Sequence, residues 1–383
     1  MIYFRENLAF MESMQHENVD GHQVKIYFQF KGDGFEYFKI VLVNLLFNVL
    51  TLGFYTPWAI VRKRKYIYQN FYLDDSPFDF TARPFNLFKG FLIYYLFFII
   101  LFVIYFNQIL AWQTGDIYAK QNATFVIYLL AFLFILLIPV FQWFAFRFRL
   151  RYSEWKGVFF SFHTPISEFY GKAIVFNLFR GIPFLHPVLY EEFTNYIFDC
   201  IAWGKKFFSS EVSSGRLYKA YTIMFLIVIG LIVIFVGISA IVVNYLRHLE
   251  LEIDKITFII VFYAIFLIFS FLTYVVYLYY QSVVLHHTLN VIRVGEAKLI
   301  FEMTPWQLFK VKLYAMFINF ITLGIAGPFM KVYVYKKITG NLCLLLPRED
   351  YLETEIHREK EVSSVGDIAL GDFDMDIGLP LGI

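Results

Sequence analysis

The apolar residues of this chain fall into long runs with few charged interruptions. Four runs are uncharged and exceed the roughly 20 apolar residues that a helix needs to cross a bilayer. They cover residues 90–112, 124–146, 220–245 and 256–280. Three further runs are interrupted by Gly and Pro, at 35–61, 169–189 and 306–334. We therefore expect an all-α integral membrane protein with about seven apolar helical segments, four of them clean spans and three of them broken.

A shorter pattern precedes the apolar runs and recurs five times. It consists of an aromatic residue or Leu, any residue, Phe, a turn, and then two large apolar residues followed by Lys. The five copies read FQFKGDGFEYFK, FDFTARPFNLFK, FSFHTPISEFYGK, FSSEVSSGRLYK and LIFEMTPWQLFK, the fourth with Ser210 in place of the second Phe. Alternating aromatics before a turn indicate a short extended segment that leads into a helix. We expect these aromatics and lysines to lie at the level of the lipid headgroups.

The broken runs belong to an internal repeat. A shift of 271 positions superposes residues 28–65 on 299–336 without a gap, and 11 of the 38 positions are identical. A degraded middle copy is visible near residues 162–196. The chain is therefore interpreted as three degenerate repeats between two tails: 1–23 N-terminal tail, 24–150 repeat 1, 151–284 repeat 2, 285–347 partial repeat 3, and 348–383 acidic tail.

Both well-preserved copies carry Thr-Leu-Gly, three residues, and then Pro-aromatic, as TLGFYTPW and TLGIAGPF. Gly permits backbone conformations that other residues resist, and Pro lacks a backbone donor, so the element predicts a break in each helix. The candidate break residues are Thr51, Gly53, Pro57, Trp58, Thr322, Gly324 and Pro328. At each break a segment either turns back to the side where it began or continues across as a kinked span.

The distribution of Lys and Arg helps to choose between these two topologies. If the three broken segments return to one face, 21 Lys and Arg lie inside and 3 lie in the outer loops. Seven kinked spans would give 15 inside and 9 outside. Positive charge accumulates on the cytoplasmic side, which favours the one-face topology and a cytoplasmic C-terminal tail. The seven-span arrangement stays as the alternative.

The amino-acid composition agrees with a membrane protein and limits the kinds of partner that we expect. The 383 residues are 59% hydrophobic and only 17% charged, with a mean hydropathy of +0.59. The formal net charge of +2 resides in short basic clusters such as 62–65, so we expect contact with anionic membrane lipids and no nucleic-acid partner. The tail could recruit a cytoplasmic partner. Two distant cysteines, Cys200 and Cys343, indicate neither a disulfide framework nor a zinc site.

Little catalytic chemistry is visible in the sequence. The four clean spans contain no Asp, Glu, Lys, Arg or His, which argues against a proton-driven carrier. The candidate intramembrane polar residues are Asn44, Asn48, Asn177, Arg180, His186 and Asn319. A structural role in hydrogen bonding or in anchoring at the interface is the simpler interpretation of all six. We expect no catalytic residues, no metal site, no cofactor and no enzymatic activity.

The segment TLGFYTPWAIVRKRKY, the repeated phenylalanine segments and the tail GDFDMDIGL together resemble the YjgN-like family of bacterial inner-membrane proteins, a domain of unknown function. The resemblance covers roughly residues 24–379. It implies a multi-pass protein of the bacterial inner membrane and supplies no substrate. Repeats with broken membrane helices favour permeation or transport of a small molecule or lipid. The alternative is a non-catalytic membrane scaffold or envelope-assembly protein.

Overall fold

The computed structural model describes residues 16–19, 23–113, 117–248 and 255–347, so the expected tails at 1–23 and 348–383 lie almost wholly outside the described residues. Along the chain, a strand, two helices and a second strand follow one another five times. Unit 1 comprises β2 (Gln23–Phe30), α2 (Gly34–Leu50), α3 (Thr56–Gln69) and β3 (Phe71–Leu73). Unit 2 comprises β4 (Ser76–Phe80), α4 (Pro84–Gln113), α5 (Ile117–Arg151) and β5 (Ser153–Trp155). Unit 3 comprises β6 (Val158–Phe162), α6 (Ile166–Phe179), α7 (His186–Asp199) and β7 (Ile201–Trp203).

The last two units follow the same order. Unit 4 comprises β8 (Lys206–Ser210), α8 (Ser214–His248), α9 (Lys255–Leu289) and β9 (Ile292–Val294). Unit 5 comprises β10 (Ala297–Phe301), α10 (Pro305–Ile321), α11 (Gly327–Thr339) and β11 (Leu342–Leu346). An additional strand, β1 (His16–Val19), pairs with β2. The five units coincide with the five copies of the phenylalanine pattern in the sequence.

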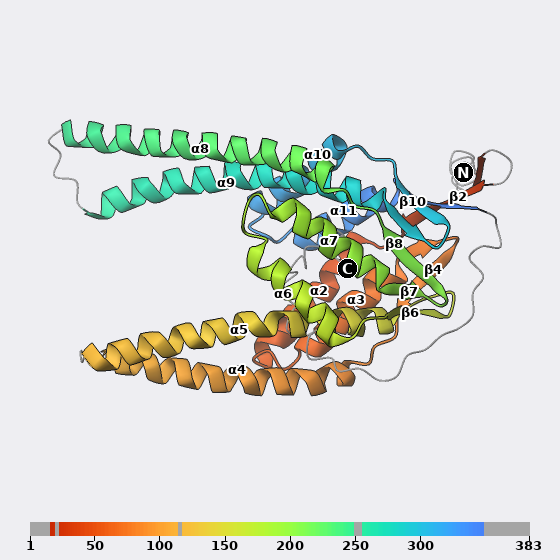
Figure 1. The fold of residues 1–383 in the computed structure, drawn as a ribbon, viewed down its shortest axis with the longest axis horizontal. Coiled ribbons are helices and arrows are strands. Elements are labelled where there is room, and N and C mark those ends of the chain that lie inside the picture. The colour runs from red at the N-terminus through yellow and green to blue at the C-terminus, as the bar shows by residue number, and fades with distance from the viewer. Residues whose placement is uncertain (1–15, 20–22, 114–116, 249–254, 348–383) are drawn as a thin grey trace.

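The strands of the five units form one closed antiparallel barrel. Strands that follow each other along the chain, from β3 to β11, lie side by side. The ring closes because β2 pairs with β11 along its first half and with β3 along its second, as in the pairs Ile26↔Leu344 and Phe28↔Leu73. Ten strands, β2 to β11, therefore enclose the barrel, which lies at one end of the molecule (Figure 1).

The expectation of an all-α fold was wrong because of this barrel. Most of its strands have only three to five residues, so the alternation of inward and outward side chains repeats only once or twice in each strand. The sequence pattern alone predicts only short extended lead-ins to helices at these segments. An isolated strand would leave its backbone donors and acceptors unpaired, and closure into a barrel satisfies them.

Aromatic side chains fill the barrel interior. Rings on strands two positions apart come close together: the ring centroids of Trp155 and Trp203 are 5.0 Å apart, and those of Phe160 and Phe208 are 6.2 Å apart. Side chains of non-adjacent strands approach this closely only on the concave face, so this face is the interior. Phe28, Phe71 and Phe78 continue the same layer. The strand aromatics of the repeated pattern, which we expected at the headgroups, therefore build the barrel core.

The second helix of each unit packs against the interior face of the next unit's first strand. The contacts involve the last residue of that strand, and we call these five residues the inner rim: Phe30, Phe80, Phe162, Ser210 and Phe301. The partner side chains, in the same order, are Tyr335 of α11, Tyr68 of α3, Phe146 of α5, Asn195 of α7 and His286 of α9. The barrel core thus continues into the helices at five equivalent places.

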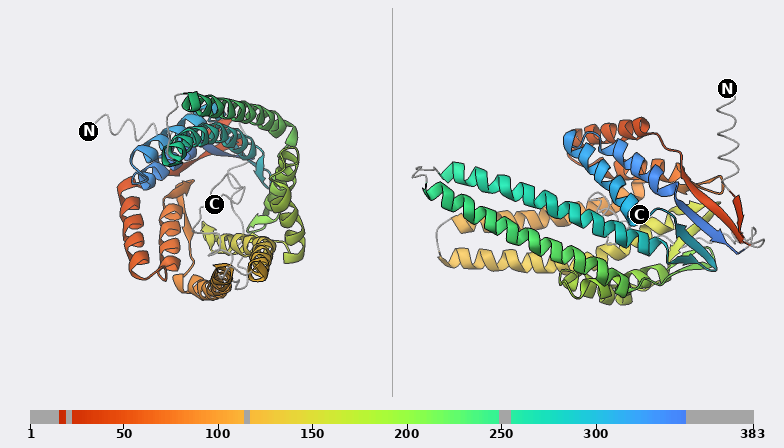
Figure 2. Two further views of the ribbon diagram at one scale, coloured as in Figure 1. Left: turned by 90° about the vertical axis from the view of Figure 1, so that its left-hand side faces the viewer. Right: turned by 90° about the horizontal axis from the view of Figure 1, so that it is seen from above.

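The helix pairs stand side by side in a ring at one end of the barrel (Figure 2). Helices α4, α5, α8 and α9 have 30 to 35 residues and are long and apolar enough to cross a membrane. The helices of units 1, 3 and 5 have only 13 to 17 residues. Long and short pairs alternate, except that the short pairs of units 5 and 1 are neighbours through α11 and α2.

Candidate functional site at the helix breaks

The Thr-Leu-Gly element ends α2 in a turn that reverses the chain. The backbone N–H of Gly53 donates to the carbonyl of Asn48 (2.8 Å), and that of Leu52 donates to the carbonyl of Val49 (3.2 Å). This pair of bonds is the Schellman arrangement, which satisfies carbonyls that a helix end leaves open. Leu52 has φ +50° and Gly53 has φ +89°, both left-handed. The returning helix α3 packs along α2.

The hydroxyl of Thr51 ties the two ends of the turn together. Its Oγ1 donates to the carbonyl of Phe47 (2.7 Å) and accepts from the N–H of Tyr55 (3.0 Å). One side chain therefore serves the last turn of α2 and the approach to α3. In hydrocarbon this matters more than in water, because no solvent replaces a missing partner.

Unit 5 repeats this geometry residue by residue. The N–H of Gly324 donates to the carbonyl of Asn319 (2.7 Å), and Thr322 Oγ1 donates to Ile318 (2.8 Å) and accepts from Ala326 (3.1 Å). Leu323 has φ +50° and Gly324 has φ +86°. The shared residues of the two sequence copies therefore encode one shared turn.

Pro57 and Pro328 lie in the first turns of α3 and α11. A helix has no internal partner for its first N–H groups, so Pro at this place loses no hydrogen bond. Trp58 lies between two rings, with centroids 6.1 Å from Tyr55 and 5.3 Å from Phe88 of α4. It thereby joins the short pair of unit 1 to the long pair of unit 2.

The break in unit 3 is built differently. Residues 180–185 turn the chain with no left-handed residue, and His186 begins α7. The His186 ring stacks on Tyr221 (5.3 Å between centroids), and its Nδ1 lies 3.3 Å from the hydroxyl of Tyr280. The guanidinium of Arg180 lies 5.8 Å from the Phe176 ring centroid. His186 thus connects the short pair of unit 3 to both long helices of unit 4.

The asparagines of units 1 and 5 face the inside of their helix pairs. Buried Asn44 donates to the carbonyl of Ala59 across the pair (3.3 Å). Asn48 Oδ1 lies 3.5 Å from the hydroxyl of Thr56. Unit 5 has Gly327 at the position equivalent to Thr56, and Asn319 Oδ1 is buried with no hydrogen-bond partner in the described part of the chain. The loss of one hydroxyl between the copies accounts for this unpaired atom.

Asn177 joins helices instead of lining a break. Its Nδ2 donates to Gln142 Oε1 of α5 (2.8 Å), and Gln142 Nε2 lies 3.4 Å from Asn177 Oδ1. This reciprocal amide pair connects unit 2 to unit 3. The predicted polar residues therefore lie at separate junctions of the ring and do not converge on one centre.

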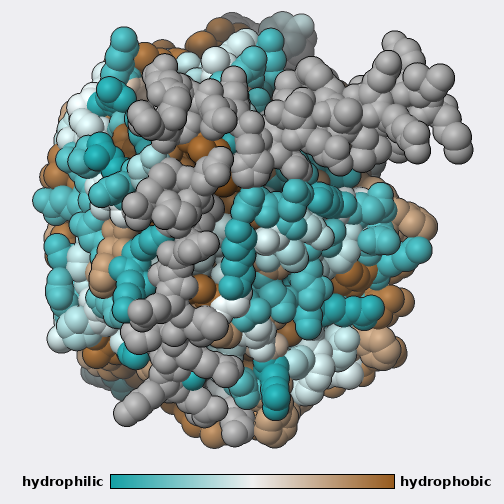
Figure 3. Space-filling view, turned by 90° about the vertical axis from the view of Figure 1, so that its right-hand side faces the viewer, coloured by the Kyte–Doolittle hydropathy of each residue, from teal (hydrophilic) through white to brown (hydrophobic). Residues whose placement is uncertain are grey.

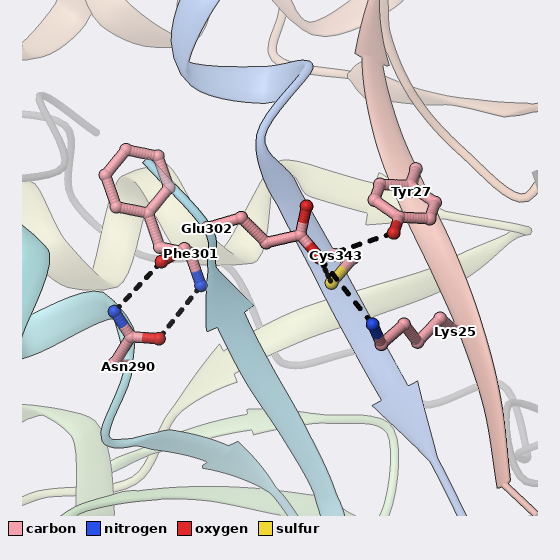
Figure 4. Close-up of polar contacts among 6 residues, drawn as sticks. All are labelled: Lys25, Tyr27, Asn290, Phe301, Glu302 and Cys343. Carbon is pink, nitrogen blue, oxygen red and sulfur yellow. Dashed lines mark hydrogen bonds and ion pairs between the residues drawn. The ribbon is translucent and has the colours of Figure 1, made fainter. Parts of the chain in front are cut away.

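Two amide side chains outside the predicted set of polar residues, Asn290 and Asn195, hold the barrel to the helices. Asn290, just after α9, donates to the carbonyl of Phe301 (3.2 Å) and accepts from its N–H (3.0 Å), as Figure 4 shows. Asn195 of α7 pairs with the backbone of Val212 in the same way (3.2 and 2.9 Å). An isolated Asn beside a helix end carries no sequence signal for this role.

Figure 4 also shows Glu302, which follows β10, beside side chains of β2. Its Oε1 lies 3.3 Å from the Tyr27 hydroxyl and 3.7 Å from Lys25 Nζ. These residues lie on the outer face of the barrel, where Tyr27 pairs with Cys343 across the strands. Figure 3, which views the barrel end, shows hydrophilic side chains over much of this surface.

The tips of the short pairs are apolar and exposed. The exposed fractions are 83% for Leu52, 91% for Leu323 and 73% for Phe184. Among the described residues, no group of three His, Cys, Asp or Glu side chains is placed to hold a metal ion. The hydrogen bonds of the breaks thus satisfy backbone groups, and the tips present apolar side chains on the protein surface.

Comparison with known proteins agrees with a membrane protein. Inner membrane protein YjgN of Salmonella typhimurium is 44% identical over 71 residues, and those of Escherichia coli O157:H7 and strain K12 are 35% identical over 71 residues. Each alignment covers 18% of this chain and 18% of the relative. No solved structure matches the chain. Residues 25–372 match the family of bacterial proteins of unknown function DUF898, and the chain belongs to that family.

Proposed function

We propose that this protein moves a lipid or another amphipathic small molecule within the inner membrane, with its barrel in the cytoplasm. The observation that carries the proposal is the alternation of long and short helix pairs in one closed ring. A ring of this kind has a complete wall near the barrel and an incomplete wall farther away. A molecule dissolved in the bilayer can therefore approach the inside of the ring from the side.

The lysines of the first helices indicate how deeply the short helix pairs enter the bilayer. Lys39, Lys89, Lys172, Lys219 and Lys310 are each the sixth or seventh residue of a first helix, so they lie at one level around the ring. Lysines at one level, with aromatic neighbours, suit the headgroup layer. From Lys39 to the end of α2 there are 11 residues, about 17 Å of helix. This is roughly half of a hydrocarbon core of about 30 Å.

Beyond the short tips, only the two long pairs continue (Figure 1). The most apolar stretches of α8 and α9 are 0% and 6% buried within the protein, so their surfaces are available to lipid. A hydrated ion on this route would meet hydrocarbon between the long pairs, at a high desolvation cost. A lipid would keep its chains in hydrocarbon, which favours an amphipathic substrate over an ion.

Phospholipid exchange between leaflets, measured with a fluorescent headgroup-labelled lipid in proteoliposomes, tests this proposal. We expect the purified protein to accelerate exchange over protein-free vesicles in proportion to its amount. Leu52→Asp with Leu323→Asp should slow it, since Asp tolerates left-handed φ but resists hydrocarbon. Leu345→Asp, on the barrel's outer face, serves as the matched control. No acceleration at any protein-to-lipid ratio would contradict the proposal.

A further inference from the structure

The inner rim carries basic side chains. The Arg64 guanidinium of α3 lies 5.7 Å from the centroid of the rim residue Phe80. Lys331 of α11 lies 6.0 Å from the ring of Tyr335, which itself contacts the rim residue Phe30. Arg151 is the last residue of α5, and its guanidinium lies over the Tyr152 ring. The Tyr152 ring contacts Phe148, which in turn contacts the rim residue Phe80. Basic side chains of the second helices of units 5, 1 and 2 thus lie near one end of the barrel interior, Arg64 in direct contact with a rim residue.

Arg151 is the least expected of these cations. It is only 8% exposed, and within the described residues its NH1 is buried without a hydrogen-bond acceptor. The centroid of the Tyr152 ring, 5.5 Å from its guanidinium carbon, faces the charge but accepts no conventional hydrogen bond. Burial of a guanidinium N–H group without an acceptor is costly, and proteins generally supply an anion or a carbonyl to such a group.

A second donor in the barrel interior has the same property. Trp203 is 3% exposed, and its Nε1 is buried with no acceptor in the described part of the chain. Its neighbour Trp155 donates to the carbonyl of Ser76 at 3.1 Å, so the indoles of this layer do find acceptors where the fold provides them. Arg151 NH1 thus lacks an acceptor that an anionic occupant would supply, and Trp203 Nε1 lacks one deeper in the barrel, at the level of Phe160.

We propose that the acidic segment 348–383 of this same chain binds at the inner rim. It contains ten acidic and three basic residues, a net charge of −7, whereas residues 1–347 carry +9. The segment follows β11 directly, so it starts from the barrel wall. Its 36 residues reach up to about 120 Å when extended, far more than the about 17 Å along β11.

The composition of the segment also matches the chemistry of the rim. Phe373, Met375 and Ile377 alternate with Asp372, Asp374 and Asp376. In an extended chain, alternate residues point to opposite sides, so carboxylates can meet the basic side chains while apolar residues meet the aromatic layer.

Photo-crosslinking in the full-length protein tests the proposal. A photoreactive phenylalanine analogue replaces Phe373, and the crosslinked peptides are identified by mass spectrometry after detergent extraction. We expect crosslinks to residues 60–68 or 143–152. Crosslinks only to the outer barrel surface, only to lipid, or none at all would each overturn the proposal.

Substitution of Arg151 gives an independent readout. Arg151→Gln should lower the crosslink yield by roughly tenfold at unchanged protein amount, and Arg151→Lys should restore most of it. Arg293→Gln, which removes an exposed cation 3.5 Å from Glu211, should leave the yield unchanged. Thermal unfolding of each variant shows whether it is folded. An unchanged yield in folded Arg151→Gln contradicts the assignment of Arg151 to the site.

Discussion

At the scale of single residues, the two Schellman turns depend on glycine for backbone reasons alone. Gly53 and Gly324 have φ near +90°, and no atom lies within 4 Å of the position that a Cβ would take. Gly53→Ala and Gly324→Ala should therefore each cost about 1–2 kcal/mol of unfolding free energy through the left-handed backbone. Thermal unfolding in detergent measures this. Gly171→Ala, inside α6 with equal space, should be neutral or stabilising.

Leu52 and Leu323 should respond in the opposite direction. Each occupies a left-handed position that helix ends usually give to Gly, and each is more than four-fifths exposed. Leu323→Gly should raise the melting temperature in detergent, because it removes roughly 1 kcal/mol of backbone strain. A lower melting temperature would show that the leucine side chain stabilises the turn through contacts. We infer that leucine is present there for hydrocarbon contact.

Thr51 offers a test of hydrogen bonding at the same turn. Thr51→Val keeps the shape but removes both the bond to Phe47 and the acceptor for Tyr55. It should cost about 1–2 kcal/mol of unfolding free energy, and Thr51→Ser, which keeps the hydroxyl, should cost clearly less. Equal melting temperatures for the Val and Ser variants would show that the hydroxyl contributes nothing.

At the scale of elements, four rim contacts are aromatic and one is polar. Unit 4 has Ser210 where the others have Phe, and its hydroxyl donates to Asn195 Oδ1 at 2.7 Å. Asn195→Ala removes this bond and both bonds to the Val212 backbone. It should cost about 2–3 kcal/mol by thermal or denaturant unfolding, and Ser210→Ala about 1 kcal/mol. If both substitutions cost the same, the amide does not hold the strand end.

The elements differ in how far the sequence specifies them. Long uncharged runs such as 220–245 predict helices directly, and Gly53 with Pro57 predicts a break in a helix. The barrel could not be derived in this way. A strand such as β3 has three residues, and its two neighbours, β2 and β4, are set by closure of the whole ring. Its aromatics looked like interfacial anchors because composition does not distinguish a headgroup layer from a barrel core.

At the scale of the molecule, the repeated motif was more informative than the repeated segment. The superposition of 28–65 on 299–336 relates unit 1 to unit 5, which are neighbours in the ring. The five phenylalanine copies mark all five units, including the two with long helices. The sequence identified Asn177 and His186 as candidate polar residues. Their partners, Gln142 and Tyr280, could not be predicted because they depend on which helices are neighbours in the ring.

We predict that all five helix pairs start and end on the cytoplasmic side of the membrane. The turns around Lys205 and Glu296 join barrel strands, so both should lie in the cytoplasm. Gln113 ends α4 and should lie on the far side of the membrane. Single cysteines at these three positions, in a background without Cys200 and Cys343, should be probed with an impermeant maleimide in intact spheroplasts. We predict labelling at Gln113 only, with the other two labelled after permeabilisation. Labelling of Lys205 and Glu296 from outside would contradict the one-face topology and support seven spans.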